Sequence, residues 1–186
     1  LVNSLEGGGA ERVITNLSEK LKKEFEIDII TLKSGIFYEL PESVQHIPLS
    51  DTRSNFMMLL LFPLLLLRFR ALVKKEEYKN GMSFLEIANF IHILSKRNAL
   101  VSFRTNMWVF KGIYGFFYRL LIRLMYPHAW QIIVNSEENR YDLASCLRLP
   151  LEKIVTLYNP IDLEAVEKLK NEPLDEILEK KLHGKK

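Results

Sequence analysis

A run of three glycines near the start of the chain, Gly7-Gly8-Gly9, constrains its fold more than any other feature. The apolar residues Leu1 and Val2 precede the run. Apolar residues at helical spacing follow it, namely Ala10, Val13, Ile14, Leu17 and Leu21. This order predicts a strand that turns through glycines into a helix at the carboxyl edge of a sheet. The free N–H groups and positive dipole end of such a helix suit a phosphate or a sugar hydroxyl. A tight turn without a ligand remains the alternative.

The spacing of these glycines disfavours two common nucleotide-binding motifs. It is not G-x-G-x-x-G, and the chain contains no G-x-x-x-x-G-K-[ST]. An oxidoreductase domain of that kind would also need an acidic residue after the second strand, which is missing here. The segment Leu1-Val2-Asn3 looks too short to pair across a sheet, so we expect a few residues to be missing upstream.

Short apolar runs alternate with helical patterns along the chain. Strands are expected at Ile27–Leu32, Val44–Leu49, Met82–Leu85, Leu100–Phe103, Ile132–Val134 and Ile154–Leu157. Helices are expected at Ala10–Lys23, Asn55–Lys75, Ile87–Ser95, Ile113–Met125 and Glu137–Leu147. This alternation predicts an α/β fold, a Rossmann-like parallel sheet with helices on both faces. Residues 1–162 would form one domain, and residues 163–186 a helical connector to something absent.

Ligands of open parallel sheets bind beyond the carboxyl ends of the strands. That rule selects the loops Glu6–Glu11, Glu86–Asn89, Arg104–Trp108, Asn135–Glu138 and Tyr158–Asp162. Within them, Glu11 either complements the helix dipole or faces the ligand edge. Ser136 is placed as an N-cap, as is Asp162 for the helix that follows it. The Arg104 guanidinium could clamp a diphosphate or pair with a carboxylate.

Composition narrows the classes of function. The formal charge of +3 is mild, and no basic patch interleaved with aromatic residues indicates a nucleic-acid partner. The single cysteine, Cys146, cannot form an internal disulfide and lies in a helical pattern, which predicts a packed thiol in a reducing compartment. The histidines show no i, i+4 pairing, so no metal site is expected.

Two segments combine apolar and basic residues. Phe56–Leu67 is apolar apart from Pro63 and is followed by Arg68, Arg70, Lys74 and Lys75. Twelve helical residues span only about 18 Å, too short to cross a bilayer of about 30 Å. Phe116–Tyr126 carries Arg119 and Arg123 at helical spacing. Each segment is either a core helix with a solvated end or stripe, or a helix at a membrane interface with its basic residues at anionic headgroups. The presence of two such segments in one small domain favours membrane contact.

Several segments together resemble the amino-terminal half of family 4 glycosyltransferases, which are retaining enzymes of the GT-B fold. In order, these are Gly8–Val13, Val134–Ser136 with Tyr141–Leu143, Glu152–Ile154 and Asn159–Asp162. The similarity is to bacterial enzymes that add a hexosamine to a polyprenyl-diphosphate-linked saccharide. One departure is Ala129-Trp130, where the family often has Ala-Asp, and this puts the cap at Ser136 in doubt. The family's carboxyl-terminal domain, with its Glu-x7-Glu pattern, is not in this sequence.

The resemblance implies the acceptor-binding half of a transferase that uses a nucleotide-sugar donor and a lipid-linked or cell-surface glycan acceptor, without a metal cofactor. It implies a peripheral place on the inner, cytoplasmic face of the membrane. Gly8, Gly9 and Glu11 would border the diphosphate and acceptor, with Arg104, Ser136 and Asn159 on the same rim. No catalytic residue can be assigned, and this half alone is expected to be inactive. The alternative is a non-catalytic Rossmann-like module that docks on membranes or partners through its apolar and basic helices.

Overall fold

The computed structural model describes residues 1–95, 98–109, 111–161 and 163–170, which form an α/β fold. Its strands are β1 (Asp28–Thr31), β2 (Gln45–Pro48), β3 (Met82–Phe84), β4 (Leu100–Phe103), β5 (Gln131–Val134) and β6 (Ile154–Thr156). Its helices are α1 (Gly9–Leu21), α2 (Asn55–Leu60), α3 (Phe62–Lys75), α4 (Glu86–Leu94), α5 (Gly112–Met125), α6 (Glu137–Leu147) and α7 (Leu163–Lys170). Every strand expected from the sequence is present, within one or two residues at each end.

All strands are parallel, and the amino-terminal segment joins two groups of them. β1 pairs with β2, and β3, β4, β5 and β6 pair in that order. Between the two groups, the Val2 N–H donates to the Ile30 carbonyl at 3.0 Å, and the Phe84 N–H donates to the Leu1 carbonyl at 2.9 Å. The expectation that this segment is too short to pair is therefore wrong. A few extended residues suffice here because each side of the backbone faces a different strand.

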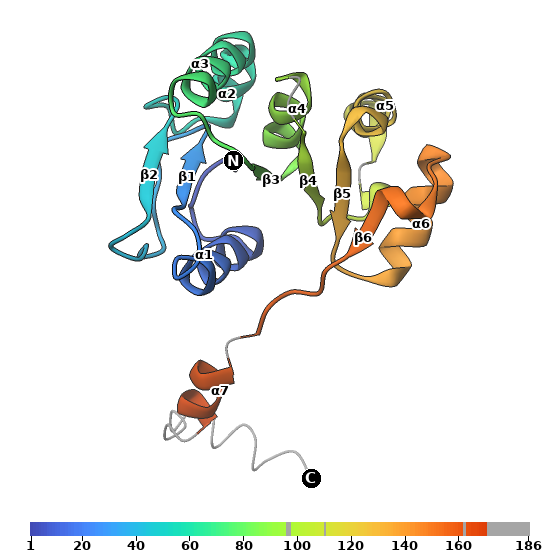
Figure 1. Ribbon diagram of the computed structural model, residues 1–186. Coiled ribbons are helices and arrows are strands. Elements are labelled where there is room, and N and C mark those ends of the chain that lie inside the picture. The colour runs from blue at the N-terminus through green and yellow to red at the C-terminus, as the bar shows by residue number, and fades with distance from the viewer. Residues whose placement is uncertain (96–97, 110, 162, 171–186) are drawn as a thin grey trace, which may run out of the picture.

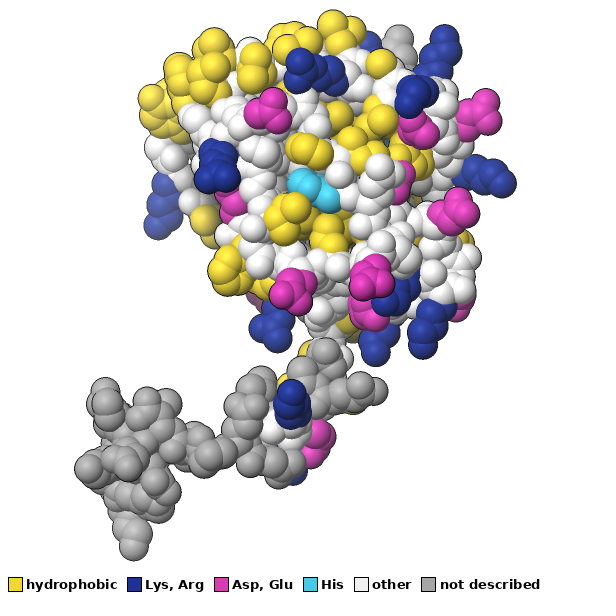
Figure 2. Space-filling model, turned by 90° about the vertical axis from the view of Figure 1, so that its left-hand side faces the viewer, with side chains coloured by type: hydrophobic (Ala, Val, Ile, Leu, Met, Phe, Trp, Pro, Cys, Tyr) yellow, Lys and Arg dark blue, Asp and Glu magenta, His cyan; other side chains and the backbone are white. Residues whose placement is uncertain are grey.

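Helices cover both faces of the sheet (Figure 1). Helix α1 lies below the sheet in that view, and α2, α3, α4 and α5 lie above it. Leu143 of α6 shares a hydrophobic cluster with Phe90 of α4 and Ile122 of α5. The expected Rossmann-like parallel sheet with helices on both faces is confirmed. Hydrophobic side chains also gather on the outer surface at the top of Figure 2, the level at which α2 and α3 lie in Figure 1.

Successive side chains along a strand point to opposite faces of the sheet. Val101 and Phe103 of β4 face the cluster that includes α4, α5 and α6. On the other side, Ile29 of β1 and Phe84 of β3 pack in a cluster with Val13 of α1. The carboxyl ends of the strands are thereby fixed between two packed layers.

The prediction of a single helix over Asn55–Lys75 is wrong. Helix α2 ends at Leu60 and α3 begins at Phe62. Pro63 lies in the first turn of α3, where an N–H has no partner within the helix, so its missing N–H costs nothing there. A proline in this position starts a second helix rather than continuing the first.

The predicted connector is described only in part. Helix α7 covers Leu163–Lys170, while Asp162 and residues 171–186 lie outside the described residues. The proposed cap at Asp162 and the division into a domain and a connector therefore remain predictions.

Candidate functional site at the carboxyl edge of the sheet

The glycine turn follows the extended residues 1–5 and leads into α1, which begins at Gly9. Gly7 has φ +101°, a conformation that side chains rarely adopt. Gly8 is the N-cap of α1, and no side chain of the described residues caps the helix by a hydrogen bond. A Cβ added at Gly9 would meet no atom within 4 Å. The start of α1 is therefore sterically open on the side that Gly9 faces.

Glu11 lies against this turn. Its side chain is buried, and a Cβ at Gly8 would lie only 2.3 Å from its Oε2. The carboxylate thus bends back over the amino end of its own helix, where the dipole favours a negative charge. The Tyr38 hydroxyl donates to the Gly8 carbonyl at 3.3 Å and fixes the turn from a distant loop. Of the two roles expected for Glu11, its position favours the structural one.

A buried lysine holds the residue that precedes the glycines. Lys33, at the end of β1, is 4% exposed and its Nζ donates to Glu6 Oε2 at 2.8 Å and to Asn55 Oδ1 at 2.9 Å. The Lys33 hydrogen bond lowers the pKa of Glu6. The sequence analysis missed Lys33, although a cation directly after an apolar strand was a visible signal.

Arg104 follows β4 and is held on several sides. Its Nη1 donates to Oδ1 of Asn159, and its Nε donates to Ser102 Oγ at 3.1 Å. The guanidinium carbon lies 5.3 Å from the centre of the Phe84 ring, in a cation–π contact. Burial lowers the pKa of Arg104, which still remains charged at neutral pH. The structure therefore brings Arg104 and Asn159 together, as a common rim requires.

A buried carboxyl group lies behind this loop. Glu86 opens α4 after Leu85, whose φ is +69°. Burial raises the pKa of Glu86, although a hydrogen bond with the Thr105 side chain opposes the shift. Asn89, three residues after Glu86 in α4, donates through Nδ2 to the Ser102 carbonyl at 2.9 Å. The predicted loop Glu86–Asn89 is thus the first turn of a helix, and it supports the end of β4.

Ser136 is the N-cap of α6, which confirms its structural role. Its Oγ accepts a hydrogen bond from the Asn139 N–H at 3.2 Å. Asn139 Nδ2 also donates to Asn135 Oδ1 at 2.9 Å. The change to Ala129-Trp130 upstream therefore does not abolish this cap. A role for Ser136 in binding substrate remains a prediction.

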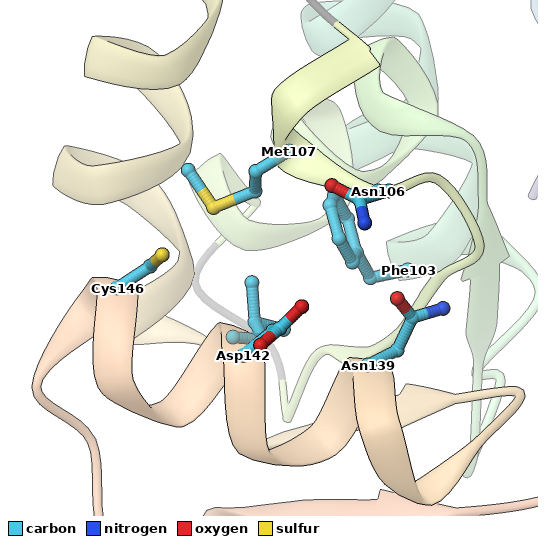
Figure 3. Close-up of a pocket in the computed structure, with 7 residues that line it drawn as sticks. Phe103, Asn106, Met107, Asn139, Asp142 and Cys146 are labelled. Atoms are coloured by element: carbon cyan, nitrogen blue, oxygen red, sulfur yellow. The ribbon is translucent and has the colours of Figure 1, made fainter.

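A small pocket separates α6 from the loop after β4 (Figure 3). Asn139 and Asp142 of α6 point towards Asn106 and Phe103 across it. Its volume of about 10 Å³ holds about one water molecule, far less than a sugar. Cys146 lines the same pocket and is half-buried, in agreement with a packed thiol.

Two of the basic residues expected at a membrane donate hydrogen bonds to backbone carbonyls. Arg68 Nη1 donates to the Leu49 carbonyl at 2.6 Å, and Arg70 Nη2 donates to the Leu94 carbonyl at the end of α4. Both side chains remain exposed. They have a structural role that the sequence analysis did not anticipate.

The other basic residues differ in their surroundings. Lys74 and Arg123 are exposed, and Arg119 is half-buried. Lys75 forms an ion pair with Glu76 at 2.7 Å, and this hydrogen bond raises the pKa of Lys75. Contact of these residues with a membrane remains a prediction.

Both apolar and basic segments expose large apolar side chains. On α2 and α3 these are Phe56, Met57, Leu59, Leu60, Leu64 and Leu67. On α5 they are Ile113, Tyr114, Phe116, Phe117, Leu120, Leu121 and Leu124. The fully buried residues of α5 are only Gly115 and Ile122. The alternative of a core helix with one solvated stripe is therefore wrong for α5, and both apolar surfaces lie on the same side of the sheet (Figure 1).

Two further features are absent from the part of the chain that the structure describes. None of its helices combines the length and apolar character needed to cross a membrane. Its His, Cys, Asp and Glu side chains form no group of three or more that could hold a metal ion.

Comparison with known proteins places these features in a family. Residues 7–165 match Glycosyltransferase Family 4. The chain is 30% identical over 175 residues to the N-acetylgalactosamine-N,N'-diacetylbacillosaminyl-diphospho-undecaprenol 4-alpha-N-acetylgalactosaminyltransferase of Campylobacter jejuni. That alignment covers 89% of this chain and 48% of the relative, so the chain spans about half the length of the relative. Since the family match covers most of its residues, the chain belongs to Glycosyltransferase Family 4, and its Rossmann-like sheet is one half of the GT-B fold.

Proposed function

We propose that this chain is the acceptor-binding half of a glycosyltransferase that moves a sugar from a nucleotide-sugar donor to a lipid-linked saccharide. The observation that carries the proposal is the open amino end of α1 at Gly9, at the carboxyl edge of a parallel sheet. Ligands of such sheets bind at that edge. Family membership and the relative's lipid-linked acceptor support the choice of ligand.

The proposed acceptor carries a diphosphate between lipid and sugar, and the edge offers groups that suit it. The guanidinium of Arg104 favours an anion, and the first-turn N–H groups of α1 do so once the Glu11 carboxylate, which lies over them, moves aside. Phe84 and Ser102 hold that guanidinium in place, so little side-chain entropy is lost when a ligand binds. In this proposal Gly8, Gly9 and Glu11 border the acceptor and Ser136 and Asn159 complete the rim.

We propose further that the protein lies on the inner face of the cytoplasmic membrane without crossing it. The sequences of α3 and α5 contain basic residues, and those of α2, α3 and α5 contain no Asp or Glu. Their exposed apolar side chains can enter the headgroup region while arginines and lysines contact anionic lipid. Such a surface would bring the acceptor's lipid tail beside the protein.

The remaining partners of the site are part of the same proposal. A carboxyl-terminal domain would bind the nucleotide-sugar donor and close the cleft, and neither a metal cofactor nor a nucleic acid takes part. A membrane-surface module without catalysis is the second candidate, which the exposed apolar helices favour. Sugar transfer distinguishes the two.

The test uses a protein in which this chain continues into its carboxyl-terminal domain. It is incubated with UDP-N-acetylgalactosamine or UDP-N-acetylglucosamine and an undecaprenyl-diphosphate-linked saccharide, and products are followed by mass spectrometry. The acceptor should gain one hexosamine, whereas the 186-residue chain alone should transfer none. Robust turnover by the chain alone would contradict a half-enzyme, and no transfer by the longer protein would favour the non-catalytic module.

A further inference from the structure

A broad groove lies in the connection between β1 and β2, outside the site described above. Its volume is about 530 Å³, and Ile36, Phe37, Tyr38, Glu39, Glu42 and His46 are among its lining residues. Figure 2 faces this edge of the molecule and shows hydrophobic side chains around a histidine near its centre, with acidic side chains below. A groove of this size accommodates a disaccharide-sized ligand.

The apolar part of the groove is unusually exposed. The side chain of Phe37 is 73% exposed and that of Ile36 is 57% exposed. The Phe37 ring meets the Tyr38 ring edge to face at 5.3 Å, an arrangement that aromatic pairs favour. Aromatic side chains exposed in a groove are typical of ligand-binding surfaces.

The charges of the groove select the kind of ligand. Among its described lining residues there are two carboxylates, Glu39 and Glu42, and no Lys or Arg. Burial lowers the pKa of His46, and its Nε2 lies 2.9 Å from the Thr31 hydroxyl, so it adds no positive charge at neutral pH. A phosphate or an anionic membrane would be repelled here. Sugar hydroxyls, in contrast, can donate hydrogen bonds to both carboxylates.

The groove adjoins the glycine turn. The Tyr38 hydroxyl bonds the Gly8 carbonyl, and Cδ1 of Phe37 lies 3.3 Å from the position of a Cβ at Gly7. A ligand that lies at the amino end of α1 can therefore extend over Phe37 into the groove without leaving the surface.

We propose that this groove is a saccharide subsite that binds the non-reacting sugars of the acceptor. This inference rests on the proposed function. Phe37 stacks against the apolar face of a neutral sugar ring, and Glu39 and Glu42 accept hydrogen bonds from its hydroxyls. The groove thereby distinguishes acceptors by the length of their saccharide, while the glycine turn and Arg104 bind the end that carries the diphosphate.

The direct test is an NMR titration of the ¹⁵N-labelled chain with the free disaccharide N,N'-diacetylchitobiose. Amide shifts should appear at residues 36–42, and inorganic pyrophosphate should leave these amides unchanged. Phe37→Ala and Glu42→Gln should each weaken binding about tenfold, the size of one lost stacking or hydrogen-bonding contact. Phe37→Trp should retain binding. Phe25→Ala is the matched control, because Phe25 is also exposed but lies beyond the carboxyl end of α1.

Failure of the saccharide subsite can be distinguished from failure of the proposed sugar transfer. Absence of disaccharide shifts at residues 36–42, or equal affinity of the parent and Phe37→Ala, would overturn the subsite even if the longer protein transfers sugar. In a longer protein that is active, Phe37→Ala should raise KM about tenfold for a disaccharide-bearing acceptor but not for a monosaccharide-bearing one, with kcat unchanged. Equal KM changes for both acceptors would also overturn it.

Discussion

Arg104 at the end of β4 donates a hydrogen bond to Asn159, 55 positions later in the chain, just after β6. Since β5 lies between β4 and β6, this bond crosses the end of the middle strand. Asn159 is neutral, so it orients the guanidinium without cancelling its charge. An arginine held by a neutral partner can still attract an anion.

Replacement of Asn159 by aspartate should cancel that charge. We expect Asn159→Asp to weaken binding of inorganic pyrophosphate to the chain about tenfold, the magnitude of one charge-assisted hydrogen bond. Isothermal titration calorimetry measures the change. Asn159→Gln, which keeps a neutral amide, is the control, and equal affinities for the parent and Asn159→Asp would argue against Arg104 as an anion-binding residue.

The close approach of Glu11 to Gly8 predicts energetic coupling between these positions. Gly8→Ala should destabilise the chain by at most about 1 kcal/mol, because its Cβ meets the Glu11 carboxylate, the far end of a flexible side chain that must move aside. In a Glu11→Ala background the same change should cost much less. Urea unfolding of the four proteins of this cycle measures the coupling. Gly9→Ala is the control and should not destabilise, since its Cβ meets open space; additive effects at positions 8 and 11 would refute the contact.

Glu86 should make the stability of the chain depend on pH. Burial raises the pKa of Glu86 in the folded state above the ordinary value of 4.5. At a pH between the unfolded and the folded pKa, the folded state therefore binds more protons than the unfolded state. Its stabilising contribution is present below the unfolded pKa and is lost as pH rises through the folded pKa. Glu86→Gln should therefore gain stability over the parent as pH rises from about 4 to about 7.

Urea unfolding across this pH range tests the prediction. Glu138→Gln is the control, because Glu138 is also in the first turn of a helix but is exposed. If Glu86→Gln and Glu138→Gln had the same pH profile, burial of the Glu86 charge would not affect stability.

The order of elements was predictable because hydrophobic patterning is local. Each apolar strand run and each amphipathic helix follows from the period of its own residues, as for Leu100–Phe103 and Glu137–Leu147. Ser136 was predictable for the same reason, since a cap depends on the next three residues.

The contacts that build the site join residues distant in sequence, and local patterns do not encode them. The Lys33–Glu6 ion pair and the Tyr38–Gly8 hydrogen bond connect positions about 30 residues apart. Burial of the charged residues Lys33 and Glu86 also runs against the usual preference of charged side chains for the surface. Arg68 was expected at a membrane, and only the folded chain places it against the Leu49 carbonyl.

Membrane association should depend on the basic residues near the apolar surfaces. Each Lys or Arg near an anionic surface is worth about 1 kcal/mol, screened within about a Debye length. Replacing Arg68, Arg70, Lys74 and Lys75 by glutamine should therefore release the chain from anionic vesicles, more readily as salt rises. Replacing Arg119 and Arg123 should have a smaller effect.

Vesicle cosedimentation measures this association. Because Arg68 and Arg70 also bond backbone carbonyls, Lys74→Gln with Lys75→Gln serves as a variant that removes charge without those bonds. Thermal unfolding of each variant checks the fold. A parent chain that ignores anionic vesicles at low salt would contradict membrane docking by these helices.

If the open amino end of α1 receives the acceptor, Gly9→Val should block it. A valine side chain there meets no protein atom near its Cβ but occupies the approach to the first-turn N–H groups. The measurement is acceptor kcat/KM in a protein that extends this chain by its carboxyl-terminal domain, together with its melting temperature. We predict loss of acceptor use with an unchanged melting temperature. A variant that folds normally and retains the parent's acceptor kinetics would show that the acceptor does not bind at the amino end of α1.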